Sequence, residues 1–222
     1  MGATAGTPGE MPTTEARETS GITSRLLLAY LDHAGGPAAV QDTLRRAGVR
    51  DREVLLRGES YWFSWETKIR LFEAAAEVLG DPLFARRMGE GALDHGISIG
   101  VQAALRALGS TSLVYRSVGR ANARFTSSHR MELLELEGRH ARISFCDASG
   151  RGRFNRLECD YSMGMLASMP QLFGLPHARV EHPECAGSGA AACVYDVTWD
   201  ERPIAALSST DRRAATAASS PR

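Results

Sequence analysis

Apolar residues recur at helical spacing through the first half of the chain. In 60-SYWFSWETKIRLFEAAAEVLG-80, Ser64 is placed to cap a helix that carries Ile69, Phe72, Ala76 and Leu79 on one face. Similar patterns, bounded by glycine, proline and small polar residues, predict further helices. The six predicted helices span 23–36, 37–48, 60–80, 81–96, 97–110 and 111–128.

The pattern changes to alternation of apolar and polar residues after position 128. Segments 130–138 and 139–149 alternate around a glycine-containing turn, which predicts a β-hairpin. A methionine-rich helix is predicted over 154–174, and two more alternating segments follow at 177–184 and 192–199. Helices followed by strands, with one helix between two strand pairs, indicate an α+β fold in which a helix crosses an antiparallel sheet.

Both ends of the chain lack such periodicity. Residues 1–21 are rich in Gly, Thr, Pro and Glu, and residues 206–222 are small and polar. We therefore expect two disordered tails, 1–21 and 206–222, around a single domain at 22–205.

Charge and length limit the possible partners. Acidic and basic residues number 26 each, and Lys68 is the single lysine. This balance gives no overall field that would favour nucleic acid or an anionic membrane. No apolar run reaches the ~20 residues that cross a bilayer, and the N-terminus lacks the order of a secretion signal. We expect a cytoplasmic protein with no direct contact to nucleic acid or membrane.

Four cysteines are the main candidates for chemistry. In a reducing cytoplasm they are expected to be buried fillers, redox groups or metal ligands. Cys185 and Cys193 lie at the rims of a predicted β connection, and His182 precedes Cys185 by three residues. Cys159 would join them if the methionine-rich helix crosses the sheet edge, whereas Cys146 in a strand pattern is more typical of a buried filler. Three thiols and an imidazole would suit a structural zinc ion.

The run His182-x2-Cys185-x3-Gly189-x3-Cys193-x-Tyr195-x-Val197-x-Trp199 resembles the C-terminal motif of the 4-vinyl reductase domain family. That family is related to the haem nitric-oxide-binding fold and belongs with small-molecule sensing. The resemblance implies a structural zinc site at Cys159, His182, Cys185 and Cys193. The family's aromatic sensors carry a carboxylate where this chain has His182, so Glu181 and Glu184 remain alternative fourth ligands.

The resemblance also implies a sensory role in signal transduction or transcription regulation. We expect a small, largely apolar ligand, a homodimer formed through the N-terminal helices, and an output protein on a separate chain. A weaker resemblance of residues 69–125 to the N-terminal effector domain of AraC-type regulators rests on the glycine-containing breaks between its predicted helices. Large apolar side chains are the candidates for the ligand pocket, with plain core packing as the alternative for each. They are Trp62, Trp65, Tyr115, Phe125, Tyr161, Met163, Met165 and Met169.

Two other functions stay open. An accessory role in tetrapyrrole vinyl reduction follows from the family's name, although the chain has no recognisable nicotinamide or flavin motif. A haem-based gas sensor would need an axial ligand, for which His95 is the candidate. The haem-binding relatives use a Tyr-x-Ser-x-Arg motif, and 115-YRSVGR-120 places its arginine one residue late. Hydrolase, phosphate-loop and metalloprotease motifs are missing, so we expect no enzyme activity.

Overall fold

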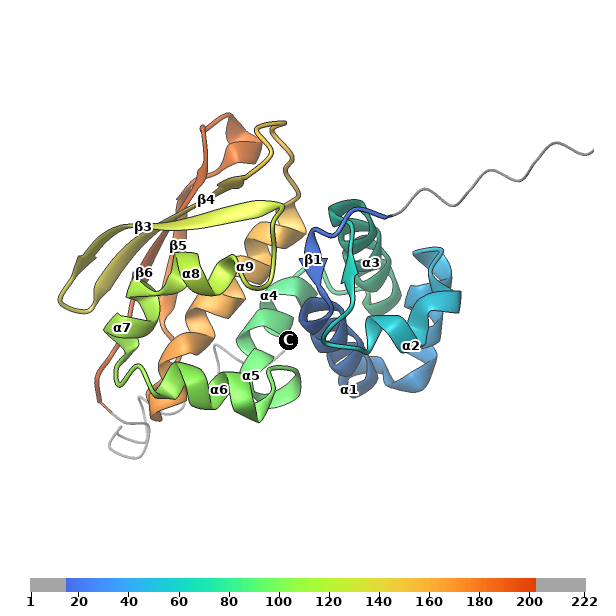
Figure 1. Cartoon of the computed structure of the whole chain (residues 1–222), viewed down its shortest axis with the longest axis horizontal. Helices are drawn as coiled ribbons and strands as arrows, with labels where there is room; N and C mark the ends of the chain where they lie inside the picture. The colour runs from blue at the N-terminus through green and yellow to red at the C-terminus, as the bar shows by residue number, and fades with distance from the viewer. Residues whose placement is uncertain (1–14, 203–222) are drawn as a thin grey trace, which may run out of the picture.

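The computed structural model describes residues 15–202. Its N-terminal half is helical, and the first helices, drawn in blue, lie to one side of a C-terminal sheet (Figure 1). Helix α1 (Gly21–Arg46) is capped by the Ser20 hydroxyl, which accepts from the amide of Ile22. It kinks at Gly36, whose φ of 71° is left-handed, just before Pro37. The kink lies at the boundary between the two helices predicted for this segment.

A short two-stranded sheet, β1 (Thr19–Ser20) and β2 (Trp62–Phe63), joins the N-terminus to the start of α3 (Trp65–Leu79). Ser64 caps α3 as predicted, because its side chain accepts from the amide of Thr67. Between α1 and β2 lie the 3-10 helix η1 (Arg50–Arg52) and helix α2 (Glu53–Leu56). The remaining helices of this half are α4 (Phe84–Glu90), α5 (Ala92–His95), α6 (Ile99–Arg106), α7 (Thr111–Arg116) and α8 (Val118–Asn122).

The C-terminal half is a four-stranded antiparallel sheet of order β3-β4-β6-β5. Helix α9 (Arg156–Ser168) lies between the two strand pairs in the sequence and packs across the sheet. The 3-10 helix η2 (Met169–Phe173) extends it (Figure 1). A third 3-10 turn, η3 (Ala186–Ser188), joins the last two strands. The strands are β3 (His129–Glu137), β4 (His140–Asp147), β5 (Arg179–Glu184) and β6 (Cys193–Thr198). The predicted α+β fold with a crossing helix is confirmed.

Two apolar cores meet at α9. One is built around α1, α3 and α4, and Leu157, Tyr161 and Met165 of α9 pack against it. The other lies between α9 and the sheet and includes Met163 and Leu166. Helices α4 and α9 approach so closely that a Cβ added at Gly164 would lie 2.1 Å from the carbonyl oxygen of Arg86. Only glycine fits there, so α9 is held against both halves of the molecule.

Several sequence-based boundaries were wrong. The helix predicted over 111–128 breaks at Ser117, whose hydroxyl donates to the Val114 carbonyl, and the helical part ends at Asn122. The helix predicted over 81–96 is interrupted at Gly91.

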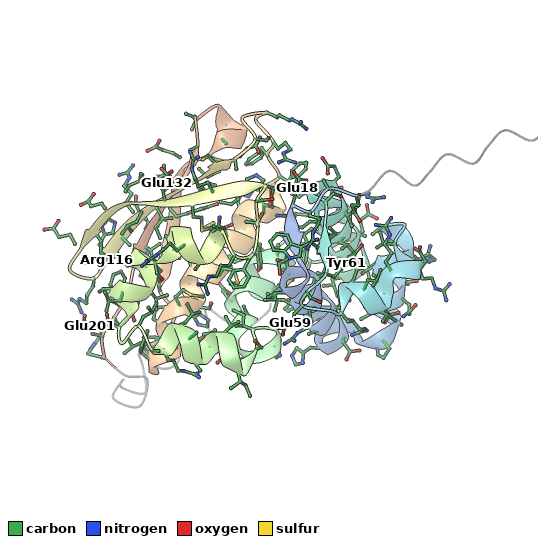
Figure 2. All side chains as sticks on the ribbon, in the orientation of Figure 1. Glu18, Glu59, Tyr61, Arg116, Glu132 and Glu201 are labelled. Carbon is green, nitrogen blue, oxygen red and sulfur yellow. The ribbon has the colours of Figure 1, made fainter. Side chains whose placement is uncertain are left out.

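The N-terminal tail prediction was also too long. Of the residues assigned to a disordered tail, Thr19–Ser20 form β1 and Gly21 begins α1. Glu15 and Glu18 anchor this segment by accepting from the amides of Ser64 and Trp65 at 3.2 and 3.0 Å. Figure 2 shows Glu18 where the N-terminal half meets the sheet. The predicted tail 206–222 lies outside the described residues.

No helix among residues 15–202 combines the length and apolarity that crossing a membrane requires.

Candidate functional site

Four potential metal ligands come together where α9 crosses the β5–β6 connection. Asn155 caps α9 by accepting from the amide of Leu157 at 2.9 Å, which places Cys159 one turn into the helix. His182 belongs to β5, Cys185 follows its last residue, and Cys193 begins β6. Between the two cysteines the chain reverses through η3 and Gly189, whose φ of 94° is left-handed. The small residues of this segment therefore serve a tight turn.

The ligand atoms of Cys159, His182, Cys185 and Cys193 lie within 4.8 Å of one another. The thiols of Cys159 and Cys193 are buried, and their sulfur atoms are 3.4 Å apart. His182 Nε2 is buried and has no hydrogen-bond partner among the described residues. A buried imidazole nitrogen without a partner is costly unless something binds it.

The two buried thiols, Cys159 and Cys193, share one proton in a hydrogen bond between their sulfur atoms. A hydrogen bond from Cys159, together with the amide of Ala186 and the nearby His182, lowers the pKa of Cys193. The same hydrogen bond to Cys193, followed by burial, raises the pKa of Cys159. A second thiolate in this space is therefore unfavourable without a cation. A bound divalent metal would supply that cation and favour deprotonation of both thiols.

Tetrahedral zinc fits this set of donors. Zn–S bonds of about 2.3 Å place two sulfur ligands about 3.8 Å apart, close to the separation observed here. Of the alternative ligands, Glu184 binds Arg142 at 2.7 Å, and Glu181 pairs with Arg179 on the exposed side of β5. The structure thus brings His182, and not either glutamate, to the three thiols. Cys146 is partly exposed on β4 and lies outside the cluster, in contrast to the buried filler expected for it.

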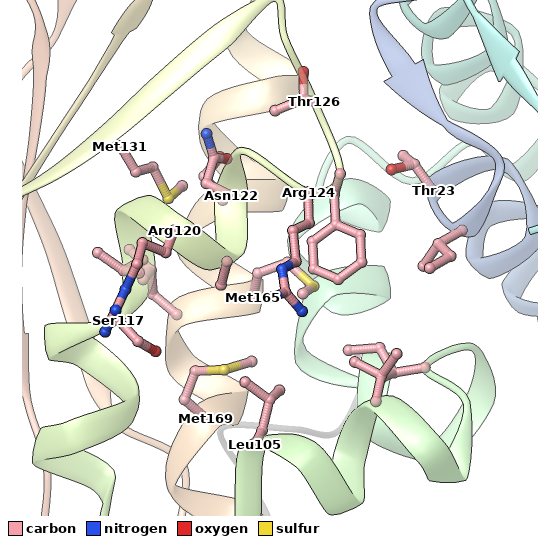
Figure 3. Close-up of a pocket in the computed structure, with 18 of the residues that line it drawn as sticks. Thr23, Leu105, Ser117, Arg120, Asn122, Arg124, Thr126, Met131, Met165 and Met169 are labelled. Carbon is pink, nitrogen blue, oxygen red and sulfur yellow. The ribbon is translucent and has the colours of Figure 1, made fainter. Parts of the chain in front are cut away.

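A cavity of about 550 Å³ lies between α9, α6, α8 and α1 (Figure 3). Figure 3 shows Met165 and Met169 extending into it, with Leu105 from α6 and Thr23 from α1 around the same space. Of the predicted pocket residues, the structure places Tyr115, Phe125, Tyr161, Met165 and Met169 in the cavity wall.

Three predicted pocket residues lie outside the cavity wall. Trp62 is in β2, where it pairs with Ser20. Trp65 donates from Nε1 to the Glu158 carboxylate at 2.7 Å, outside the wall. Met163 packs in the core between α9 and the sheet, with its sulfur 3.9 Å from Arg86 Nη1.

Sequence reasoning missed a polar cluster at one end of this cavity. Lys68 and Glu158 form a buried ion pair there, and both line the cavity. His129 lies beside them, with Nδ1 3.5 Å from Glu158 Oε1 and 3.0 Å from the hydroxyl of Ser128. The available signals were that Lys68 is the only lysine and that Glu158 is adjacent to a candidate metal ligand.

Comparison with solved structures identifies the fold. An H-NOX protein from S. oneidensis, solved in the Fe(II) ligation state, matches with a TM-score of 0.63 and 13% identity over 82% of this chain and 96% of that chain. An unliganded Fe(II) H-NOX protein from K. algicida matches with a TM-score of 0.63 and 9% identity over 82% and 97%. The chain therefore has an H-NOX-like fold, as the family resemblance implied. At these identities the likeness establishes the fold alone.

No protein-family profile matches this sequence, and no curated protein matches it.

The residues around the cavity do not fit haem. His95, the candidate axial ligand, stacks on His33 with ring centroids 4.6 Å apart and is not part of the cavity wall. His129 is the one histidine in that wall within the described region, and its ring lies flat on Phe145, 4.7 Å between centroids and 7° between planes. The Tyr115 hydroxyl donates to the Leu166 carbonyl at 2.8 Å. The imidazole of His129 is thus held by its stacking on Phe145 and by the contact of Nδ1 with the Ser128 hydroxyl at 3.0 Å.

Proposed function

We propose that this protein is a sensory domain of the 4-vinyl reductase type that binds a small, largely apolar molecule in the α9 cavity and holds a structural zinc ion at Cys159, His182, Cys185 and Cys193. The domain acts without catalysis of its own. Its output belongs to a separate signalling or transcription protein.

One observation carries this proposal: α9 takes part in both sites. Tyr161 and Met165 line the cavity, while Cys159, on the same helix, belongs to the metal cluster. A ligand that fills the cavity better in one position of α9 would favour that position. The metal ion would transmit the shift to β5 and β6, because it ties α9 to their connection.

The apolar wall and the flexible methionines support a ligand that is mostly hydrocarbon. Leu105, Met165 and Met169 surround the middle of the cavity, and thioether side chains adapt to ligands of different shape. A volume near 550 Å³ is in the range of small-molecule sites. A filled Cys3His set leaves zinc no open coordination position, which supports a structural and not a catalytic ion.

Metal analysis tests the zinc site. Protein purified without added zinc is expected to contain about one zinc ion per chain. Cys159→Ala, Cys185→Ala and Cys193→Ala should each lose it, whereas Cys146→Ala, a cysteine outside the cluster, should retain it. A wild-type protein that is metal-free and stably folded would refute the zinc site.

Native mass spectrometry tests whether the cavity binds a small apolar molecule, as the sensory function requires. A co-purifying or added apolar molecule should add mass to the wild-type chain, and a cavity-filling variant, Ala121→Phe, should not bind it. Ala121 lines the cavity on α8 and is only partly buried, which leaves room for the fold to accept the larger side chain. Equal binding by both proteins would place the ligand elsewhere.

The homodimer is proposed to form through the N-terminal helices. Val54 and Leu55 of α2 support this, because their side chains are 84% and 51% exposed. Light scattering with Val54→Asp is the test, since a dimer formed there should dissociate to monomers.

A further inference from the structure

The cavity has one strongly polar end, which we define as Lys68, Glu158, His129 and Thr19. Lys68 is 6% exposed, Glu158 is 2% exposed, and all four residues line the cavity. Two opposite charges buried beside an apolar space are unusual, because burial of ions is costly unless their hydrogen bonds are satisfied.

Hydrogen-bonding capacity at this end is incompletely used. The Lys68 ammonium has three hydrogens, and within residues 15–202 its acceptor is the Glu158 carboxylate. That carboxylate also accepts from Trp65 Nε1 at 2.7 Å. The hydroxyl of Thr19 is buried, with the residue 1% exposed, and has no partner in this part of the chain. Donors of Lys68 and Thr19 therefore remain for an acceptor placed in the cavity.

The charge balance determines what kind of acceptor fits. Lys68 and Glu158 neutralise each other, and burial lowers the pKa of His129, which favours its uncharged form. An anionic group beside Lys68 would introduce a second buried negative charge near Glu158. Among the described residues that carboxylate has ion-pair contacts with Lys68 and His129, whereas Arg120 and Arg124, which also line the cavity, make none with it. A second negative charge is strongly disfavoured in a dry site. An uncharged oxygen acceptor avoids this penalty.

We propose that the polar end binds the carbonyl or hydroxyl oxygen of an uncharged and otherwise apolar ligand, with Lys68 and Thr19 as its hydrogen-bond donors. This assignment rests on the proposed small-molecule function and adds the ligand's chemical class and orientation. The oxygen lies at the Lys68 end, and the hydrocarbon body extends between α6 and α9 toward Met165 and Met169.

Three matched probes test the assignment by equilibrium dialysis against the full chain. They are 2-acetylnaphthalene, which has an acceptor oxygen, 2-ethylnaphthalene, which lacks it, and the anion 2-naphthoate. We expect the acetyl compound to bind about tenfold more tightly than the ethyl compound, the scale of a hydrogen bond to a charged donor. Naphthoate should bind more weakly than the acetyl compound.

Variants locate the preference in the protein. Thr19→Val should reduce the preference for the acetyl over the ethyl compound about threefold. Thr43→Val is the matched control, because Thr43 also has a buried hydroxyl without a partner among the described residues but lies outside the cavity wall. The double variant Lys68→Met with Glu158→Met keeps the Thr19 hydroxyl, so it should reduce the tenfold preference for the acetyl compound to about threefold.

The possible failures are distinguishable. Equal binding of the two neutral probes by the wild type, or tighter binding of naphthoate, overturns the assignment and leaves the apolar cavity function intact. An unchanged acetyl preference in Thr19→Val and in the double variant overturns the roles of these donors. Absence of binding of both neutral probes would refute the small-molecule function itself. If the double variant does not fold, the wild-type and Thr19→Val measurements decide.

Discussion

Replacement of Lys68 by methionine should destabilise the protein strongly, because it leaves Glu158 buried without its cation. The side chains of the pair are 7% and 3% exposed. Removal of one member of such a pair typically costs about 3–5 kcal/mol. For a chain of this size that loss lowers the melting temperature by about 6–20 °C.

The second substitution distinguishes loss of packing from loss of charge compensation. Lys68→Met together with Glu158→Met removes both charges and keeps the volume apolar, which is often neutral for stability. The double variant should therefore be more stable than the single variant by at least about 2 kcal/mol, although Trp65 Nε1 then loses its acceptor.

Urea denaturation at pH 7, followed by circular dichroism, measures both values. Arg46→Met is a suitable control, since its pair with Glu77 is 46% and 65% exposed and should contribute less than about 0.5 kcal/mol. A single Lys68→Met variant that loses less than about 1 kcal/mol, or a double variant less stable than the single one, would show that Lys68 does not compensate Glu158 in solution.

Two further predictions concern the supports of α9. Gly164→Ala places a Cβ 2.1 Å from the Arg86 carbonyl oxygen and should destabilise the protein by about 2–4 kcal/mol, measured by thermal melts. Gly100→Ala is the control, because it has open space around it and should leave the melting temperature unchanged. Equal melting temperatures of the two variants would disprove the close approach of α4 and α9. Although burial alone would raise it, hydrogen bonds from the amides of Arg153 and Ser149, and the Arg153 guanidinium, hold the pKa of Asp147 well below its usual range. Its contribution to stability is thus present above about pH 4, the unfolded value, and is lost as the pH falls further. Asp147→Asn should lower stability at pH 7 by about 1–3 kcal/mol and flatten the acid limb of a stability-against-pH curve, and an unchanged acid limb would contradict this.

The sequence predicts the large elements of this fold well, because their periodicity extends over many residues. Strands β3 to β6, and helix α9 with its extension η2, begin and end within a few residues of the predicted positions. Strands β1 and β2 have two residues each and carry no periodic signal, so β1 was assigned to the disordered tail. The break at Ser117 could not be predicted, because the apolar positions Leu113, Val114, Val118 and Ala121 continue at helical spacing across it.

The two candidate sites differ in how far sequence could anticipate them. Cysteines are rare, and Cys185 and Cys193 lie at the two ends of one β connection, so the thiols could be singled out. The full set followed from the family resemblance, which left Glu181 and Glu184 as alternatives to His182. Lys68 and Glu158 are 90 residues apart, and although Lys68 is the only lysine, nothing in either local sequence indicates a partner. Their pairing depends on how α3 and α9 pack, which no local pattern encodes.

Helix α9 also determines how the molecule is expected to open. Its contact with α4 through Gly164 involves no metal, whereas its connection to β5 and β6 includes Cys159 and the cluster. Chelation should therefore lower the local opening free energy of the sheet and leave the N-terminal helices protected. In hydrogen exchange the amides of β5 and β6 would lose protection before those of α1 and α3. The domain would then behave as two cooperative units, and occupancy of the metal site would decide whether they unfold together or in succession.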